Sequence, residues 1–178
     1  MIIEYDGITL RDIAQSDVPV VASIYLAGWP KQQIFNQAQM ESTITAWVRS
    51  SETHAHDYVE GILPITPETG FIHCFVAEHG GGVVGVIKWK CKNRTALVES
   101  LIVELGKRQL GHFTKMFEAG TAFVFSQLDL DAVEFDIAPE SVPLNNKANE
   151  KDYDNLRVMT TGKRRVTTTK EQYLLTIT

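Results

Sequence analysis

The order of strand-like and helix-like segments between residues 72 and 137 constrains the fold of this chain most strongly. Apolar runs rich in β-branched residues predict three consecutive strands, at 72–77, 83–90 and 95–103. His79 and three glycines separate the first two runs, and glycine accepts the positive φ angles of a tight hairpin turn. The apolar period then becomes that of a helix over residues 111–127 and returns to that of a strand at 132–137. This order predicts a parallel crossover beside an antiparallel meander, which is an α+β domain with a mixed sheet.

The flanking segments are predicted to complete this sheet and to cover it. Residues 7–13 alternate apolar and polar side chains and predict a first strand. Ser16 is a candidate N-cap for a first helix, and a second amphipathic helix is expected at 37–48. The remaining segments are expected to be a short polar helix and the two strands of a terminal hairpin, at 146–155, 157–161 and 172–177.

The length of 178 residues predicts one domain, because no internal repeat or linker divides the chain. The stretch 50–70 is polar and rich in turn-forming residues, and it is expected to be a long loop insertion. Long loops in compact domains are often lids or binding elements. We therefore expect this segment to border the side of the site that binds the second substrate.

The charge balance argues against two classes of partner. Seventeen Lys and Arg against 22 Asp and Glu give a net charge of -5, which opposes binding to nucleic acids and to anionic membranes. A basic cluster is expected to be a solvated part of the final hairpin turn: Lys163, Arg164, Arg165 and Lys170. No segment has the pattern of a signal peptide or a membrane span, so we expect a cytoplasmic protein.

The cysteines and histidines do not predict a metal centre. Cys74 and Cys91 lie in apolar segments without CxxC spacing and are interpreted as reduced core thiols. His54, His56 and Asp57 are three candidate ligands in one polar segment without a fourth. We therefore expect no metal site.

The junction from Leu101 to Phe113 is the most informative segment for function. A strand there leads through Gly106 and Gly111 into a helix, and a helix N-terminus offers free N–H groups and a positive dipole end to a phosphate. The segment matches neither GxxxxGK[ST] nor GxGxxG. Taken alone, the junction indicates an anion site without identifying the ligand.

The register of the junction resembles the acyl-CoA-binding motif of the GNAT superfamily of N-acyltransferases, [RQ]-x-x-G-x-[GA], which reads here from Arg108 to Phe113. Val103 lies five residues before the Arg, as the valine at the end of the family's strand does. Two positions depart from the pattern: Leu105 stands at the frequent proline position, and Phe113 replaces the final small residue. Phe113 would either crowd a bound pyrophosphate or face the core.

A second match lies further along the chain. Asn146, Tyr153 and Leu156 follow the spacing of the family's fourth helix, but Arg157 and Val158 replace the usual Gly-Phe. The resemblance covers nearly all of the chain except 50–70. It implies an α+β fold of GNAT type, with a mixed, mostly antiparallel sheet, a splayed central strand pair and flanking helices.

The resemblance also implies an acetyl-CoA-dependent N-acetyltransferase in which a primary amine attacks the thioester directly. Acetyl-CoA would lie where the strands ending near Val103 and Ile137 separate, with CoA as a product. Backbone N–H groups near Ile102 would stabilise the oxyanion, and those of 109–113 would bind the diphosphate. The residues expected to contact the cofactor are Leu101, Ile102, Val103, Arg108, Gln109, Leu110, Gly111, His112, Phe113 and Asn146.

Two residues are expected to be catalytic by this resemblance. Glu99 stands where many members place a base, and strict alternation along its strand would put it on one face with Leu101 and Val103. Glu134 and Asp136 on the neighbouring strand are alternative bases. Tyr153 aligns with the tyrosine that protonates the leaving thiolate, and its other interpretation is an ordinary packing residue. Asn146 would bond the pantetheine amides, cap its helix, or do both.

Other interpretations of the sequence stay open. The chain could be a non-catalytic acyl-CoA-binding module, or an interaction protein that keeps the fold without the cofactor. The acceptor amine is not identified, because polyamines, amino acids, antibiotics and peptide N-termini all fit, although the negative net charge favours a cationic acceptor. Base rates favour a homodimer.

Overall fold

A computed structural model describes residues 2–28, 36–59, 71–128, 130–137, 156–158 and 164–176. Its centre is a single twisted sheet in the spatial order β1-β2-β3-β4-β5-β6-β8-β7. The strands are β1 (Ile2–Tyr5), β2 (Ile8–Asp12), β3 (Phe71–His79), β4 (Gly82–Lys92), β5 (Thr95–Val103), β6 (Ala132–Ile137), β7 (Leu156–Val158) and β8 (Arg164–Thr169). Among these described strands, β5 and β6 pair in parallel and all other neighbours pair antiparallel. The predicted mixed, mostly antiparallel sheet is therefore confirmed.

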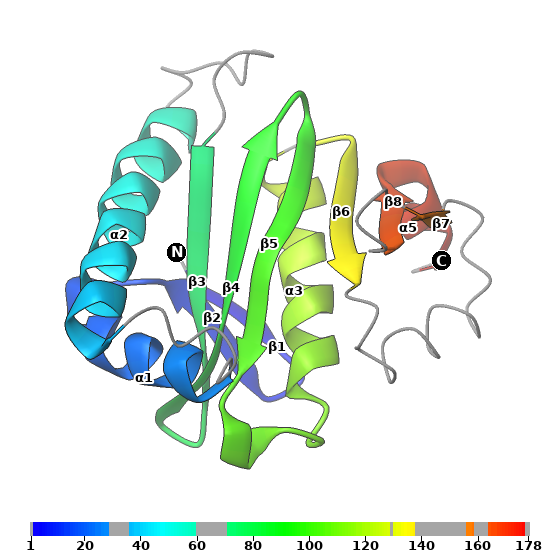
Figure 1. Cartoon of the computed structure of the whole chain (residues 1–178). Helices are drawn as coiled ribbons and strands as arrows, with labels where there is room; N and C mark the ends of the chain where they lie inside the picture. Colours follow the sequence, from blue (N-terminus) through cyan, green and yellow to red (C-terminus); the bar gives the residue numbers. More distant parts are fainter. Residues whose placement is uncertain are drawn as a thin grey trace.

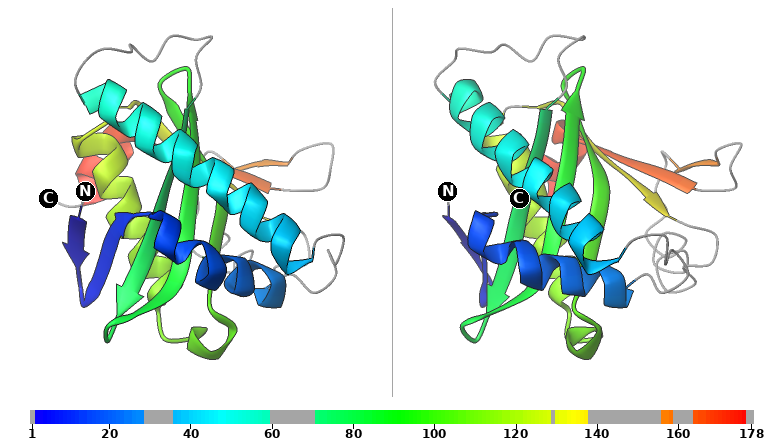
Figure 2. Two further views of the ribbon diagram at one scale, coloured as in Figure 1. Left: turned by 90° about the vertical axis from the view of Figure 1, so that its left-hand side faces the viewer. Right: turned by 60° about the vertical axis from the view of Figure 1, so that its left-hand side comes forward.

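Helices cover both faces of this sheet. α1 (Val18–Gly28) and α2 (Gln37–Val59) cross one face over β3, β4 and β5, and α3 (His112–Ser126) lies along the other (Figures 1 and 2). A fourth helix, α5 (Lys170–Thr176), follows β8. The bounds of β5 and β6 agree with those predicted, and α3 agrees to within one residue at each end.

Each face has its own hydrophobic core, and on the α3 side the helix approaches β4 closely at Trp89. The Trp89 indole is buried and meets the Phe75 ring edge-on at a centroid distance of 5.6 Å. A Cβ placed on Gly120 of α3 would lie 2.2 Å from the indole, so only glycine allows this approach of helix and strand. Burial of apolar surface on both faces fixes which side of each strand faces α3.

The strand predicted at 7–13 is confirmed as β2, but the strand β1 before it was not expected. β1 pairs with β2 as a hairpin through Asp6 and Gly7, whose φ angles are 44° and 77°. An Asp-Gly pair at positive φ is the usual signature of a two-residue hairpin turn. The sequence therefore contained the signal for β1, and our expectation of a first strand at 7–13 missed it.

The second helix is longer than predicted, so the expected loop at 50–70 is wrong in its first half. α2 continues to Val59, beyond the expected end at residue 48. The buried face formed by Ile44 and Val48 continues with Ser51, whose Oγ accepts a hydrogen bond from the Cys74 N–H at 3.2 Å. A polar side chain on the core face concealed the helical period. The part at 60–70 lies outside the described residues.

The C-terminal prediction is also corrected. The final strand is β8 at Arg164–Thr169, and the segment expected to be a strand at 172–177 is instead helical to Thr176. Thr169 and Gln172 form a reciprocal cap: the Gln172 N–H donates to Thr169 Oγ1 at 3.2 Å, and the Thr169 N–H donates to Gln172 Oε1 at 3.0 Å. This capping box starts a helix at that point.

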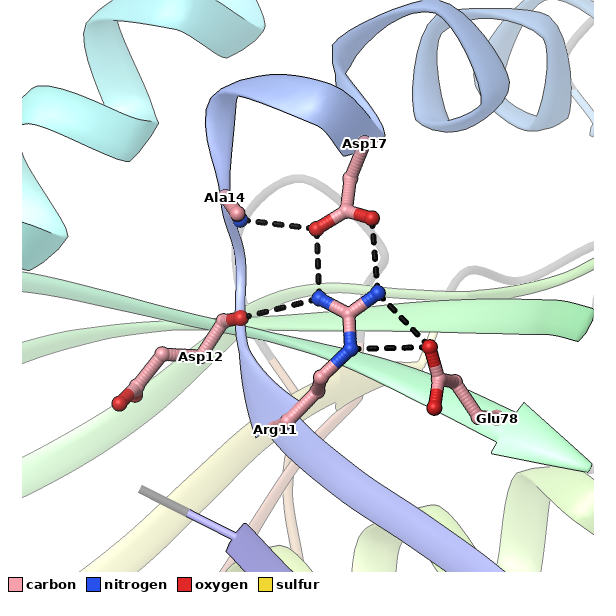
Figure 3. Close-up of polar contacts among 5 residues, drawn as sticks. All are labelled: Arg11, Asp12, Ala14, Asp17 and Glu78. Carbon is pink, nitrogen blue, oxygen red and sulfur yellow. Dashed lines mark hydrogen bonds and ion pairs between the residues drawn. The ribbon is translucent and has the colours of Figure 1, made fainter. Parts of the chain in front are cut away.

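A charged cluster holds the start of α1 against the sheet. Arg11 on β2 donates to both carboxylate oxygens of Asp17 at 2.7 and 2.8 Å and to Glu78 of β3 at 2.9 Å (Figure 3). The Ala14 N–H donates to Asp17 Oδ2 at 2.8 Å. Burial alone would raise the pKa of Asp17, but these hydrogen bonds outweigh it and lower that pKa. The residue that organises this helix start is thus Asp17, and not the expected Ser16.

Candidate active site

The parallel strands β5 and β6 pair along only part of their length. The ladder joins Thr95 with Ala132 and continues to Val98 with Phe135. Beyond that point β5 runs on to Val103 against β4, while β6 runs on to Ile137 against β8. Among the described residues, β5 beyond Val98 therefore has no β6 partner, which leaves its backbone groups on that edge open to a ligand.

A β-bulge lies where the two strands separate. Lys88 pairs with Ser100 and Trp89 pairs with Val98, so Glu99 is an extra residue in β5. Side chains normally alternate between the faces of a strand, and a bulge of this kind interrupts the alternation. Val98 packs in the α3 core before the bulge, whereas Ser100 lies against α1 after it.

This bulge corrects the expected orientation of Glu99. Leu101 and Val103 pack against the α3 core, but Glu99 lies on the opposite face with α1 and α2. Glu99 Oε2 is 3.0 Å from Lys88 Nζ, and that ammonium lies 4.0 Å from the ring centroid of Trp47 on α2. The candidate base is therefore held beside the separation of the strands by a lysine that packs on an aromatic ring.

A buried hydroxyl pair lies next to Glu99. The Tyr25 hydroxyl on α1 donates to Ser100 Oγ, and both side chains are buried. Burial raises the pKa of Tyr25 far above its ordinary value. Tyr25 thus fixes α1 to β5 at the bulge, and it stays protonated at physiological pH.

The loop after β5 directs the chain into α3. Glu104 N–H donates to the Val84 carbonyl at 2.8 Å, and a short 3-10 turn follows at Leu105–Lys107. Gln109 and Gly111 then have φ angles of 69° and 78°. A Cβ on Gly111 would meet nothing within 4 Å, so there is open space on the Cβ side of this residue.

Gly111 is the N-cap residue of the 15-residue α3 and provides no side-chain cap. The N–H groups of the first helical turn have no intrahelical acceptor, and the positive end of the helix dipole lies at the same place. An anion at this point would meet both the free donors and the dipole. This uncapped helix start follows a strand whose edge is open, an arrangement that suits an anion such as phosphate.

No protein-family model matches the sequence, and no curated protein matches it. Solved structures do match. FdhC, described as a nucleotide-linked sugar GNAT, superposes with a TM-score of 0.73 at 10% identity, covering 98% of this chain and 93% of its own. RimJ from Mycobacterium smegmatis with CoA-disulfide has a TM-score of 0.68 at 15% identity, with coverage of 99% and 93%. Spermidine N-acetyltransferase from Vibrio cholerae with CoA and spermine has a TM-score of 0.66 at 16% identity, with coverage of 94% and 98%.

The chain has the GNAT fold. The resemblance inferred from the sequence is thus confirmed at the level of the fold, including the separated central strand pair. Sequence identities of 10 to 16% are too low to assign an activity or a substrate to this chain.

Within this GNAT fold, Phe113 does not obstruct the start of α3. Its side chain is partly buried and packs against the α3 core, so of the two expected orientations the structure has the one toward the core. Leu105 and Leu110 are exposed by 58% and 61% and leave the loop surface apolar. Although Phe113 replaces the small residue of the family motif, its side chain therefore leaves the N-terminus of α3 accessible.

His112 contributes a buried ring beneath the same turn. The ring lies 4.9 Å from that of His79, centroid to centroid, and His79 Nδ1 is 2.8 Å from the Gly7 carbonyl oxygen. Burial, with the neighbouring His79, lowers the pKa of His112. The buried position of this ring leaves the backbone N–H as the group that His112 offers to a ligand.

The alternative bases on β6 are engaged with Arg165 of β8. Arg165 donates to both oxygens of Asp136 at 2.7 and 3.0 Å and to Glu134 Oε2 at 3.1 Å. The hydrogen bonding of Arg165 to Asp136 is the main cause of the raised pKa of Arg165. Arg165 was expected in a solvated hairpin turn, and that placement is wrong because it lies within β8 and joins two strands.

Some predicted site residues fall outside the described part of the chain. Asn146, Tyr153 and the short helix expected at 146–155 are among them. The described ends next to 60–70 are Val59 and Phe71, and Phe71 pairs with Cys91 at the end of the sheet where β5 begins. The pairing thus places Phe71 away from Val103.

Sequence reasoning missed Lys88 and Tyr25 as neighbours of the site. The sequence did contain one signal for these contacts, namely Lys88 itself. A lysine inside the apolar strand β4 requires a charged or aromatic partner when it faces another layer. Within the described residues, no three His, Cys, Asp or Glu side chains gather as metal ligands, and no helix is long and apolar enough to cross a membrane. Cys74 and Cys91 are free, and burial raises both thiol pKa values to about 12.

Proposed function

We propose that the protein is an acetyl-CoA-dependent N-acetyltransferase that transfers an acetyl group directly to a primary amine. The observation that carries this proposal is the separation of β5 and β6 after Val98, followed within one loop by the uncapped N-terminus of α3. An open strand edge suits the amide groups of pantetheine, and the helix start suits a diphosphate. The GNAT fold of the chain supports the assignment of both features to one acyl-CoA cofactor.

We propose three places of contact with the cofactor. The N–H groups of residues 109–113 would hold the diphosphate, since the N-terminus of α3 at Gly111 has no side-chain cap. The open edge of β5 at Leu101, Ile102 and Val103 would bind the pantetheine arm, with a donor near Ile102 for the developing oxyanion. Asn146 would add an amide contact. The thioester, when bound, supplies an activated acetyl group.

Side chains of the protein would accept the proton that the amine loses and donate the proton that the thiolate gains. Glu99 at the bulge is the proposed acceptor of the proton that the attacking amine loses, directly or through one water. Tyr153 is the proposed donor of a proton to the departing thiolate. No covalent acyl-enzyme is required, and the buried thiols Cys74 and Cys91, whose pKa values are raised, are unsuited to form one.

The proposed acceptor is a small-molecule or peptide amine. The net charge of -5 favours a cationic acceptor over an anionic one. The spermidine N-acetyltransferase named above acts by its name on a polyamine, which makes polyamines the first compounds to assay. We propose a cytoplasmic location, consistent with two unpaired cysteines.

Turnover of acetyl-CoA with a panel of amines tests this function directly. Release of free CoA thiol is measured with polyamines, amino acids, aminoglycosides and short peptides, and acetylated products are identified by mass spectrometry. Amine-dependent release of thiol supports the proposal. Tight CoA binding with no turnover on any amine would contradict the catalytic part.

One observation favours a second candidate, an acyl-CoA-binding module without catalysis. All three carboxylates considered as bases are engaged in ion pairs: Glu99 with Lys88, and Glu134 and Asp136 with Arg165. A carboxylate engaged in an ion pair must give up or share that contact before it can accept a hydrogen bond from a substrate amine. Binding without turnover in the assay above would select this candidate.

A further inference from the structure

Arg108 connects the loop of residues 104–111 to the end of α1. Its Nε–H donates a hydrogen bond to the Val103 carbonyl at 3.2 Å. A Cβ placed on Gly28, the last residue of α1, would lie 3.1 Å from Arg108 Nη2 and 3.2 Å from Ile102 Cγ2. The guanidinium therefore lies directly against the Gly28 backbone, in space that a side chain would take.

The charge at this contact is favourable. The carbonyl groups in the last turn of a helix lack intrahelical donors and carry the negative end of the helix dipole. A cation placed there is stabilised, and Arg108 lies beside this last turn. Packing, one hydrogen bond and the dipole all hold the side chain toward α1 and β5.

We propose that Arg108 is a positioning residue and that Gly28 is the residue that makes room for it. Arg108 holds the end of β5 at Val103 and the start of the following loop in the conformation that presents the N–H groups of 109–113. In this account Arg108 acts on CoA through the backbone and not through its charge. The proposal deepens the proposed function and rests on it for the identity of the ligand.

Two substitutions of Arg108 distinguish a positioning role from a direct contact between its charge and CoA. In glutamine the amide nitrogen is attached to Cδ, as Nε is in arginine, so Arg108→Gln retains a donor for the Val103 carbonyl without the charge. Arg108→Lys retains the charge but places a methylene at that position. If Arg108 is a positioning residue, the CoA affinity of Arg108→Gln should be closer to that of the wild type than the CoA affinity of Arg108→Lys is.

The first measurement is CoA affinity by titration calorimetry on folded variants. We expect Arg108→Lys and Gly28→Val each to weaken CoA binding about tenfold, or about 1.4 kcal/mol, and Arg108→Gln to weaken it less than threefold. The matched control is Gly106→Val, because Gly106 lies in the same loop and a Cβ there meets nothing within 4 Å. Retained affinity in Arg108→Lys with loss in Arg108→Gln would overturn the proposal in favour of a charge contact.

The second measurement needs no ligand and separates this proposal from the proposed function. Backbone amide NMR of the free protein is recorded for the same four variants. We expect Gly28→Val and Arg108→Lys to shift the same amide resonances between Val103 and Gly111, and Arg108→Gln to shift them far less. Unchanged loop resonances in Gly28→Val would overturn the proposal. If the wild type binds no CoA, the proposed function fails and these resonances alone decide the role of Arg108.

Discussion

Glu99 Oε2 lies 3.0 Å from Lys88 Nζ at the bulge where β5 leaves β6, so the candidate base and its counter-ion come from neighbouring strands. The Lys88 ammonium also lies over the Trp47 ring, and only 12% of the Lys88 side chain is exposed. The sheet and the helix layer of α2 thus meet at this ion pair. Any chemistry assigned to Glu99 has to operate with this lysine in place.

Replacement of Glu99 tests its role as the base. Glu99→Gln keeps the shape but cannot take a proton, so kcat should fall roughly 100-fold, while the CoA affinity stays within about twofold. Glu134→Gln is the matched control, because that carboxylate is engaged by Arg165. Steady-state kinetics with a saturating amine provide the measurement. Equal losses in the two variants, or none in Glu99→Gln, would remove Glu99 from the mechanism.

Gly111 tests the position of the diphosphate. Gly111→Val places a β-branched residue at a φ of 78°, which strains the backbone at the N-terminus of α3, so CoA binding should weaken tenfold or more, about 1.4 kcal/mol. Gly81→Val introduces the same strain at a φ of 81° in the β3–β4 turn, where a Cβ also meets nothing within 4 Å. Calorimetry should show weaker CoA binding in Gly111→Val and unchanged CoA binding in Gly81→Val. Unchanged affinity in Gly111→Val means that the diphosphate binds elsewhere.

Tyr153→Phe tests the proposed proton donor. A thiolate leaving a partly dry site is poorly solvated, and a phenol supplies a proton without carrying a charge beforehand. The variant should lower kcat roughly ten- to a thousandfold, with little change in acetyl-CoA affinity. Stopped-flow and steady-state turnover provide the measurement. Equal turnover by the variant would leave water as the proton source.

The Arg11–Asp17 pair predicts a pH dependence of stability. The pKa of Asp17 is lower in the folded protein than in the unfolded chain, so its contribution is present above about pH 4 and is lost as pH falls through the folded pKa. Asp17→Asn should therefore cost roughly 1–3 kcal/mol at pH 7 and progressively less below about pH 4. Urea denaturation at a series of pH values measures this difference.

Asp131→Asn is the control for that experiment, because it removes an exposed carboxylate that also pairs with an arginine, Arg94. Solvent screens such a pair, so we expect a much smaller change in the free energy of unfolding. A loss in Asp17→Asn that does not diminish on acidification is incompatible with the ion pair as its cause.

The central elements could be predicted because their signals are local. β5, β6 and α3 each show an apolar period that burial against a neighbouring layer enforces, and their bounds were predicted closely. The missed elements also had local signals: Asp6 with Gly7 for the first hairpin, and Thr169 with Gln172 for α5. These errors arose from turn and capping chemistry that was overlooked.

The geometry of the site could not be predicted in the same way. The orientation of Glu99 depends on the bulge, and a bulge is a property of two paired strands and not of β5 alone. The ion pairs of Lys88 and Arg165 likewise join residues brought together by strand pairing. Periodicity within one segment contains no information about such partners.

A structure of the protein with acetyl-CoA tests the central claim most directly. We predict diphosphate oxygens within hydrogen-bond distance of the N–H groups of residues 109–113, and the pantetheine arm along the edge of β5 beyond Val98, where β6 has separated. A cofactor bound away from this edge, or saturating acetyl-CoA that leaves the N-terminus of α3 empty, would contradict the account.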